Sequence, residues 1–366
     1  MGDDELALVW SLCPGLAPST LRRLVRAFGG IRAFHEAPVA DWVACGGLDA
    51  AQASRLDAWR RAEPSAYRIK SQFEHRGIWV LVHGADDYPR RLSDLPDPPL
   101  VLFVRGRKEC LSPERVVFGM VGTRRMTSYG MEAARWIAGE IARRGAVVVS
   151  GLAMGIDATA HAAALEVGGD TVSVLGCGID RCYPPSNRRL YHQIASTGTL
   201  VSEYPPGTPV RKHHFPERNR LIAALSQAVI VVQAGDRSGA LITAQCALDL
   251  GRDVYAVPGP ITSRASRGVN RLLFDGAIPL VDPHDLFPEQ TDVENGGAQK
   301  VPAHLEPCYQ ALARHQPIRA GELASVAHLD LGYVFGALLE MELASMVTRH
   351  PDGTYHIRPN RAPSGS

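Results

Sequence analysis

One stretch of the sequence, residues 211–222, carries the kinds of side chain that bind nucleic acids. It combines one aromatic ring, four fixed cations and a single acid: Phe215, Arg211, Lys212, Arg218, Arg220 and Glu217. Cations hold a phosphate backbone and an aromatic ring stacks on a base, so this composition favours a nucleic-acid site. The alternative is a solvated loop before a helix, because Pro216 and Asn219 are turn and cap residues.

Three loops elsewhere supply glycines and polar side chains. They span residues 122–127 (GTRRMT), 150–157 (SGLAMGID) and 235–243 (GDRSGALIT). Glycine lets backbone N–H groups approach an anion, and the positive end of a following helix favours phosphate. The steric demands of a tight turn explain any one loop alone, whereas three loops at one edge of a sheet favour an anion site.

An alternation of apolar strands and helices must position these loops. The predicted strands span residues 116–121, 146–150, 171–175, 199–203, 228–233 and 253–257. Their nearly continuous apolar runs indicate strands that are covered on both faces. We therefore predict an α/β domain at residues 67–287, with a doubly wound, Rossmann-like parallel sheet that binds its ligand at the carboxyl ends of the strands. A further strand at Ile78–Val82 leads into this sheet or adds an edge to it.

Short helices joined by glycine turns are predicted on the N-terminal side, over residues 1–66. Ser19 is a candidate N-cap for a helix with an apolar stripe, and Gly29-Gly30 ends that helix. A second helix spans residues 50–61. The arrangement resembles a SAM-like or helix-hairpin-helix domain, a module that contacts DNA in some proteins and acts as a spacer in others.

A different composition begins near the C-terminal end. Residues 288–302 are rich in Gly, Glu, Gln and Asp without periodicity, which indicates a flexible linker. Helices at 306–315, 322–327 and 331–341, followed by hairpin strands at 347–349 and 354–357 with a turn at Asp352-Gly353, then predict a winged-helix domain over residues 303–360. Glu340 and Glu342 disfavour strong major-groove binding by its third helix, which leaves protein contact and weak duplex binding as alternatives.

The overall composition indicates a folded protein without a global positive charge. The chain has 366 residues, of which 45% are hydrophobic and 21% charged, and its net charge is +1. Any nucleic-acid surface must therefore be a local patch. No apolar run approaches the about 18 residues of a membrane helix, and the N-terminus is acidic, unlike a signal peptide. The seven cysteines form no C-x-x-C pair, which argues against a zinc site and favours the reducing cytoplasm.

Motifs of common enzyme classes are missing from the sequence. It has no G-x-S-x-G elbow, no G-x-x-x-x-G-K-[ST] phosphate loop and no G-x-G-x-x-G fingerprint. The acids near the predicted strand ends do not form the paired clusters that a two-metal nuclease needs. His213 and His214 lack neighbouring Cys or Asp partners, so we expect no metal and no cofactor. The protein is not expected to be an enzyme.

Taken in order, the motifs of the central domain resemble the DNA-processing protein A (DprA, also called Smf) family. The matching segments are residues 121–124, 150–157, 215–222, 238–240, 258–259, 268–270 and 276–277. The resemblance implies a homodimer, formed through the Rossmann domain, that binds and protects single-stranded DNA. It also implies loading of a RecA-type recombinase in place of single-strand-binding protein during natural transformation.

The resemblance also assigns DNA-binding residues. The predicted site comprises Gly122, Thr123, Arg124, Arg125, Gly151, Lys212, Phe215, Arg218, Asn219, Arg220, Ser238 and Gly239. We expect Arg124, Lys212, Arg218 and Arg220 to hold successive phosphates, with help from the amides of Gly122, Gly151 and Gly239. Phe215 is expected to stack a base, with little sequence preference.

Two other functions remain as alternatives. Related Rossmann folds that cleave nucleoside monophosphates carry a Pro-Gly-Gly-x-Gly-Thr-x-x-Glu loop where this chain has residues 235–243, which contain no glutamate. Release of a base from a nucleoside monophosphate would identify such an enzyme. The other alternative is a duplex-DNA-binding regulator that acts through the winged helix. Its isolated C-terminal domain would bind duplex more tightly than the central domain binds single strands.

Overall fold

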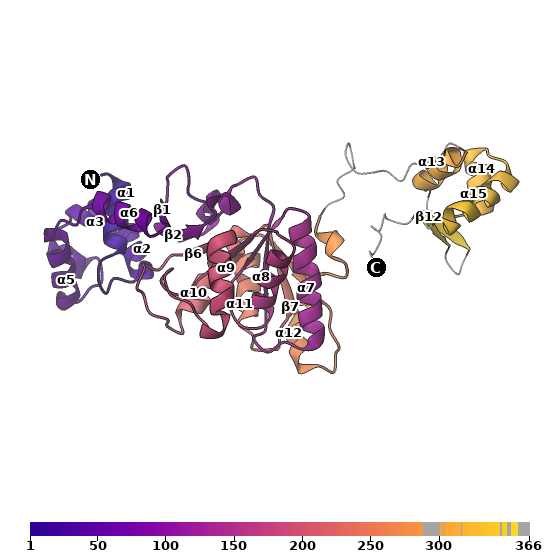
Figure 1. The fold of residues 1–366 in the computed structure, drawn as a ribbon. Helices are drawn as coiled ribbons and strands as arrows, with labels where there is room; N and C mark the ends of the chain where they lie inside the picture. Colours follow the sequence, from indigo (N-terminus) through magenta and orange to yellow (C-terminus); the bar gives the residue numbers. More distant parts are fainter. Residues whose placement is uncertain (288–300, 303, 316, 345, 350–352, 358–366) are drawn as a thin grey trace. The chain divides into compact units, whose positions relative to one another are not determined.

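The chain divides into two compact units, Met1–Pro288 and Glu289–Ser366 (Figure 1). The computed structural model describes residues 1–287, 301–302, 304–315, 317–344, 346–349 and 353–357. Most of the predicted linker at 288–302 lies outside the described residues, as do residues 303, 316, 345, 350–352 and 358–360 of the predicted winged helix. Asp352 of the predicted hairpin turn is among them.

A sheet of nine strands forms the centre of the first unit. The strands are β1 (Ile78–Val82), β2 (Val101–Gly106), β3 (Val117–Gly122), β4 (Val147–Ser150), β5 (Thr171–Val174), β6 (Thr199–Ser202), β7 (Ala228–Gln233), β8 (Asp253–Ala256) and β9 (Ile278–Pro279). Their spatial order is β1-β2-β6-β5-β4-β3-β7-β8-β9. Strands β3 to β9 are parallel, whereas β1 and β2 pair antiparallel and join the sheet at β6. The order reverses between β3 and β7, the switch point of the doubly wound sheet.

The predicted α/β sheet is confirmed. The six predicted strands of the central domain form with bounds shifted by at most one residue, and Ile78–Val82 adds an edge through β2. Residues of one strand alternate between two cores: Val117 and Val121 of β3 belong to one, and Phe118 and Met120 to the other. This burial on both faces is the reason that the strands are continuous apolar runs.

Helices cover both faces of the sheet. They are α7 (Ser128–Arg143), α8 (Ile156–Glu166), α9 (Arg188–Thr197), α10 (His214–Leu225), α11 (Ala240–Asp249) and α12 (Arg267–Phe274). Short 3-10 helices lie at Arg90–Asp94, Lys108–Leu111, Pro185–Asn187, Arg264–Ser266 and Pro283–Leu286. Helices α10, α11 and α12 pack in the core on one face, and α7 and α8 in the core on the other.

The N-terminal helices pack on the β1 and β2 edge of the sheet (Figure 1). They are α1 (Asp3–Ser11), α2 (Pro18–Ala27), α3 (Ile31–Glu36), α4 (Val39–Ala44), α5 (Ala50–Arg61) and α6 (Ala66–His75). Trp10, Phe34 and Trp42 form a core among the helices themselves. A second core joins Leu8 and Phe73 to residues of the sheet, so helices and sheet belong to one unit.

The predicted N-cap of the helix before Gly29-Gly30, Ser19, is wrong. Helix α2 begins at Pro18 with Ala17 as its N-cap, so Ser19 lies inside the first turn and does not cap it. Proline is favoured at the first helical position because the N–H it lacks has no helical partner there. The predicted apolar stripe is confirmed, since Leu21 and Leu24 are buried. The SAM-like assignment stays a prediction.

The second unit holds three helices and a small sheet within its described residues. They are α13 (Glu306–His315), α14 (Ala320–Ala327), α15 (Leu331–Leu343), β10 (Ile318–Arg319), β11 (Val347–Arg349) and β12 (Thr354–Ile357). The strand order is β10-β12-β11, and these elements share a core of their own. The predicted helices and hairpin strands therefore form, while the winged-helix assignment stays a prediction. Among the described residues, none of the helices has both the length and the apolar character that crossing a membrane requires.

Candidate nucleic-acid interface

A cavity of about 670 Å³ lies at the switch point of the sheet. Its walls are Val121, Gly122, Thr123, Arg124, Ala153, Asp157, Tyr183, Lys212, Phe215, Pro216, Arg218, Asn219, Ile222, Gly235, Asp236, Arg237, Ser238, Gly239, Ala240, Ile242 and Thr243. The loops after β3 and β7 diverge here, because the helices that follow these two strands pack on opposite faces. Ligands of open parallel sheets bind at this position.

The structure brings most of the predicted site residues together. Those that line the cavity are Gly122, Thr123, Arg124, Lys212, Phe215, Arg218, Asn219, Ser238 and Gly239. Arg125, Gly151 and Arg220 do not line it. Arg125 is exposed outside the cavity, and its backbone N–H donates to the Thr123 hydroxyl oxygen at 3.2 Å.

Helix α10 explains the position of Arg220. Successive residues of an α-helix are about 100° apart, so side chains two positions apart point in different directions. Phe215, Arg218 and Asn219 line the cavity, whereas Arg220 donates to the carboxylate of Glu203 at 2.6 Å. The expectation that Arg220 holds a phosphate in the same pocket as Arg218 is therefore not met. Closeness in sequence grouped two side chains that the helix separates.

Arg218 supports the cavity from below. Its side chain is buried, and its Nη1 donates to the carbonyl oxygen of Gly151 at 2.9 Å and to that of Val174. Burial lowers the pKa of Arg218 to about 10, against the opposing charge of Asp157, so the guanidinium stays protonated at neutral pH. Because its Nη1 bonds two backbone carbonyls, Arg218 holds the loop after β4 in place and adds positive charge to the cavity wall.

The glycine at position 151 serves packing. A Cβ there would lie 2.4 Å from the Arg218 guanidinium, so only glycine leaves room for that group. The Gly151 N–H donates to the Asp157 carboxylate at 3.2 Å, and the Ala153 N–H donates to the same oxygen at 3.4 Å. The expectation that the Gly151 amide helps to hold a phosphate is therefore wrong. Burial raises the pKa of Asp157, although Arg218 and these two N–H groups oppose the shift.

Three cations face the cavity with their charges unpaired. Arg124, Lys212 and Arg237 are exposed and form no ion pair with the part of the chain that the structure describes. The Arg124 guanidinium lies over the Phe215 ring, 5.5 Å from its centroid. Because neither Arg124 nor Lys212 is neutralised, the cavity attracts anions.

Aromatic surface accompanies these cations. Phe215 is half-buried. The centroids of the Tyr183 and Phe215 rings are 5.4 Å apart, and the angle between the ring planes is 36°. Tyr183 was not among the predicted site residues. It lies on the loop between β5 and α9, and the same rule that selected the other loops would have found it, because this loop also follows the carboxyl end of a parallel strand. Arg237 was missed within a loop that the sequence analysis did select.

The loop after β7 presents the start of a helix to the cavity. Helix α11 begins at Ala240, directly after Ser238 and Gly239. The Ser238 hydroxyl oxygen accepts from the Ala240 N–H at 3.4 Å, and the Asn219 amide donates to the Gly239 carbonyl at 3.4 Å. The positive end of α11 therefore adds to the attraction that the cavity exerts on an anion.

The described side chains form no metal site. Within the described ranges, no group of three or more His, Cys, Asp or Glu residues is placed to hold a metal ion. Of the two adjacent histidines, His214 is buried and its ring stacks on Tyr204 at 4.1 Å. Its Nδ1 lies 3.1 Å from the carbonyl oxygen of Gly176. His214 therefore serves packing.

Comparisons with known proteins point to one family. Residues 79–291 match the family model described as DNA recombination-mediator protein A. Protein Smf of Synechocystis sp. is 33% identical over 98% of this chain and 100% of its own length. The crystal structure of DNA processing protein A from Streptococcus pneumoniae is similar with a TM-score of 0.65 and 31% identity, over 78% of this chain and 97% of that one. DNA processing protein A from Helicobacter pylori, whose structure is described as giving a single-stranded DNA binding mode, is similar with a TM-score of 0.52 and 32% identity, over 57% of this chain and 93% of that one.

Proposed function

Since this chain belongs to the DNA recombination-mediator protein A family, we propose that it binds single-stranded DNA in the cavity between β3 and β7. The observation that carries this proposal is the combination in one cavity of exposed cations with a half-buried aromatic ring. Membership confirms the resemblance to the DprA/Smf family. The description of the related Helicobacter pylori protein as a single-stranded DNA binder supports the same function here.

In the proposed complex, Arg124, Lys212 and Arg237 hold phosphates and a base stacks beside Phe215. The Arg124 guanidinium now lies over the Phe215 ring. A base that takes this face displaces the guanidinium toward the neighbouring phosphate, so Arg124 exchanges one favourable contact for another. Backbone charge and stacking do not distinguish bases, and the expected sequence preference is low.

We propose binding without catalysis. Of the two acids in the cavity wall, Asp157 accepts two backbone N–H groups and Asp236 pairs with Arg267 at 3.8 Å. Residues 235–243 offer no glutamate to a glycosidic carbon. The bound strand is instead protected and passed on. We propose that a RecA-type recombinase receives it in place of single-strand-binding protein, during natural transformation or homologous recombination. A homodimer that acts in the cytoplasm is part of the same proposal.

Salt dependence of binding tests the site. Binding of a fluorescein-labelled oligothymidylate is measured by anisotropy over a range of salt concentrations, with a duplex of equal length for comparison. Each phosphate contact contributes roughly 0.7 to the slope of log affinity against log salt for single strands. Arg124→Met and Lys212→Met should each flatten the slope by roughly this amount.

Arg143→Met is the matched control, because Arg143 is exposed on α7 and is paired with Glu140 outside the cavity. It should bind with the affinity and slope of the wild type. Unchanged binding by both cavity variants would contradict the proposed site. Release of a free base from nucleoside monophosphates by the wild type would contradict the proposal of binding without catalysis.

A further inference from the structure

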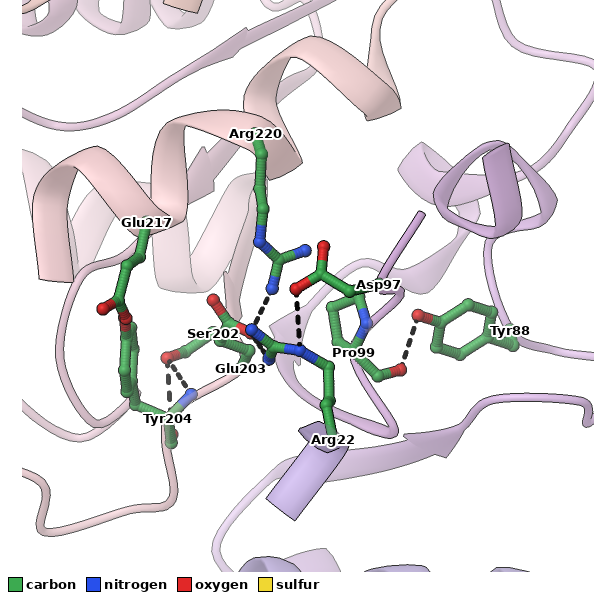
Figure 2. Close-up of polar contacts among 9 residues, drawn as sticks. All are labelled: Arg22, Tyr88, Asp97, Pro99, Ser202, Glu203, Tyr204, Glu217 and Arg220. Carbon is green, nitrogen blue, oxygen red and sulfur yellow. Dashed lines mark hydrogen bonds and ion pairs between the residues drawn. The ribbon is translucent and has the colours of Figure 1, made fainter. Parts of the chain in front are cut away.

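A buried ion-pair cluster joins the N-terminal helices to α10 on the side away from the cavity (Figure 2). Its centre is Glu203, which directly follows β6 and whose side chain is 2% exposed. Arg22 of α2 and Arg220 of α10 both donate to the same Glu203 oxygen at 2.6 Å. Arg22 also pairs with Asp97 at 3.1 Å. One carboxylate therefore connects two helices that are about two hundred positions apart in the chain.

The charges of this cluster depend on one another. The side chains of Arg22 and Arg220 are 8% and 13% exposed, so little solvent reaches either guanidinium. Without Glu203, two buried cations would face each other, and a buried charge that loses its partner is strongly unfavourable. Conversely, loss of Arg22 would leave Glu203 with Arg220 as its remaining partner. Arg22 and Arg220 are thus held in place by a shared acid.

Glu203 and the residue after it, Tyr204, contact one face of α10 at three residues. Tyr204 stacks on His214 at 4.1 Å, and its hydroxyl donates to Glu217 at 3.0 Å. With Arg220, these residues follow one another at intervals of three along the helix, so they share a face. A different face of the helix carries Phe215, Arg218 and Asn219 into the cavity, while Leu221 and Leu225 pack in the core of the sheet.

The cluster also explains the sequence of this segment. A cation two residues after Arg218 looks like a second phosphate ligand, yet Glu203 binds it on the far side of the helix. Arg22 is unusual as well, because it is a buried arginine on α2, whose other buried residues are leucines. The Tyr88 side chain packs beside the cluster and donates to the Pro99 carbonyl at 2.8 Å, which ties the intervening loop to the same place.

From this geometry we infer that Arg22 and Glu203 are positioning residues for the single-stranded DNA site. Arg22 fixes Glu203, Glu203 fixes Arg220, and the position of α10 that results sets Phe215 and Arg218 in the cavity. The N-terminal helices thereby contribute to DNA affinity without touching DNA. This inference rests on the proposed function of the cavity and adds the residues that hold it in shape.

Four variants of the full chain test the inference: Arg22→Met, Arg22→Lys, Glu203→Gln and the double variant Arg22→Met/Glu203→Gln. Oligothymidylate binding is measured at several salt concentrations, and thermal unfolding is followed in parallel. Arg22→Met and Glu203→Gln should each weaken binding threefold or more with the salt slope unchanged. Arg22→Lys should recover part of the loss, because its ammonium still reaches an acid. The double variant should bind no more weakly than the weaker single variant, since both changes break one connection.

Arg32→Met is the control, because it breaks an exposed ion pair with Asp3 in the same helical region. It should bind as the wild type does. Should Glu203→Gln fail to fold, Arg22→Met still tests the inference, since the Glu203 and Arg220 pair survives in that variant. Wild-type affinity in folded Arg22→Met and Glu203→Gln would overturn the inference. A salt slope flattened by roughly 0.7 in Arg22→Met would overturn it too, because Arg22 would then contact a phosphate.

Failure of the proposed function gives a different result. If the wild-type chain does not bind single strands, the function of the cavity is wrong and the inference falls with it. If the wild type binds, Arg124→Met weakens binding and Arg22→Met does not, the cavity is correct and only the positioning role is wrong.

Discussion

At the scale of single residues, charge and burial divide the arginines of this chain into two groups. Arg124 and Arg237 are exposed in the cavity and have no acidic partner among the described residues, so their charge is available to a ligand. Arg218 and Arg220 are enclosed by the protein, and each donates from one guanidinium nitrogen, to backbone carbonyls or to Glu203. An enclosed arginine with a partner inside the protein is less available to a phosphate than an exposed one. Exposure therefore separates binding arginines from supporting ones, although the sequence analysis assigned a phosphate to Arg124, Arg218 and Arg220 alike.

Removal of the Phe215 ring tests the stacking contact. Phe215→Ala should weaken binding of an oligothymidylate by roughly 1–3 kcal/mol, the usual effect of losing one base stack. Phe215→Tyr keeps the aromatic face and should bind nearly as tightly as the wild type. Anisotropy titrations at one salt concentration measure both. Equal affinity of the alanine and tyrosine variants would show that no base stacks on this ring.

A buried histidine makes stability depend on pH. His161 lies in α8, and burial lowers its pKa to about 3. Its Nδ1 lies 2.7 Å from the Thr171 hydroxyl oxygen, and that hydroxyl donates its hydrogen to the Val148 carbonyl, so Nδ1–H is the donor to Thr171. In the unfolded chain the histidine takes up a proton near its ordinary pKa, whereas the folded protein does not. Folding is therefore penalised as pH falls below about 6.5.

The pH prediction compares two proteins. Between pH 7 and pH 5, His161 should reduce the free energy of unfolding by on the order of 2 kcal/mol, and His161→Leu should lack this part of the loss. Urea denaturation at both pH values measures it. An identical loss in the wild type and the variant would place a protonated histidine in the folded protein, contrary to its burial.

At the scale of elements, what the sequence predicts well is set by strong local patterns. The strands of the central sheet are predicted to within one residue because both of their faces are buried, which makes the apolar runs continuous. The faces of α10 were harder to predict. Arg220 carries the charge expected of a phosphate ligand, and its acidic partner Glu203 follows a strand that no local pattern connects to this helix. The third member, Arg22, comes from a different part of the chain altogether.

The same limit applies to the glycines of the loops. Gly151 and Gly239 look alike in the sequence as residues that could offer an amide to an anion. In the structure, the site of a Cβ at Gly151 is filled by the Arg218 guanidinium, whereas a Cβ at Gly239 would meet open space. The difference arises from α10, whose Arg218 guanidinium fills the space beside Gly151, whereas its Asn219 amide reaches only the carbonyl oxygen of Gly239. Sequence spacing does not contain that information.

Alanine substitutions at these two glycines test the packing of the loop against α10. Gly151→Ala should lower the free energy of unfolding by several kcal/mol, roughly the effect of separating a buried charge from its partners. Gly239→Ala should change it by no more than about 0.5 kcal/mol, as substitutions in open space do. Chemical denaturation of both variants measures the difference. A stable Gly151→Ala variant with wild-type DNA affinity would show that Arg218 is free to leave its carbonyl partners.

At the scale of the whole molecule, the N-terminal helices and the second unit differ in whether they share a hydrophobic core with the sheet. The N-terminal helices share a core with the sheet, in which Leu8 and Phe73 pack with Ile78 and Phe103. The second unit has a core of its own, built from residues such as Leu323, Leu338 and Met341. The N-terminal helices also have a core among themselves, yet the core that they share with the sheet ties their folding to it, whereas a part whose core is separate folds independently. The two ends of the chain should therefore respond differently to deletion.

Deletion of residues 289–366 should leave a protein that unfolds in one cooperative transition and binds oligothymidylate within about twofold of the full chain, a difference of under 0.5 kcal/mol. The cavity and the Arg22 to Glu203 connection both lie within Met1–Pro288, so the deletion removes no part of the proposed site. Deletion of residues 1–75 removes α1 to α6 and uncovers β1, and this protein should lose the cooperative transition. Calorimetry and anisotropy measure both. A more than tenfold loss of single-strand affinity on removal of the second unit would show that the cavity does not account for DNA binding by itself.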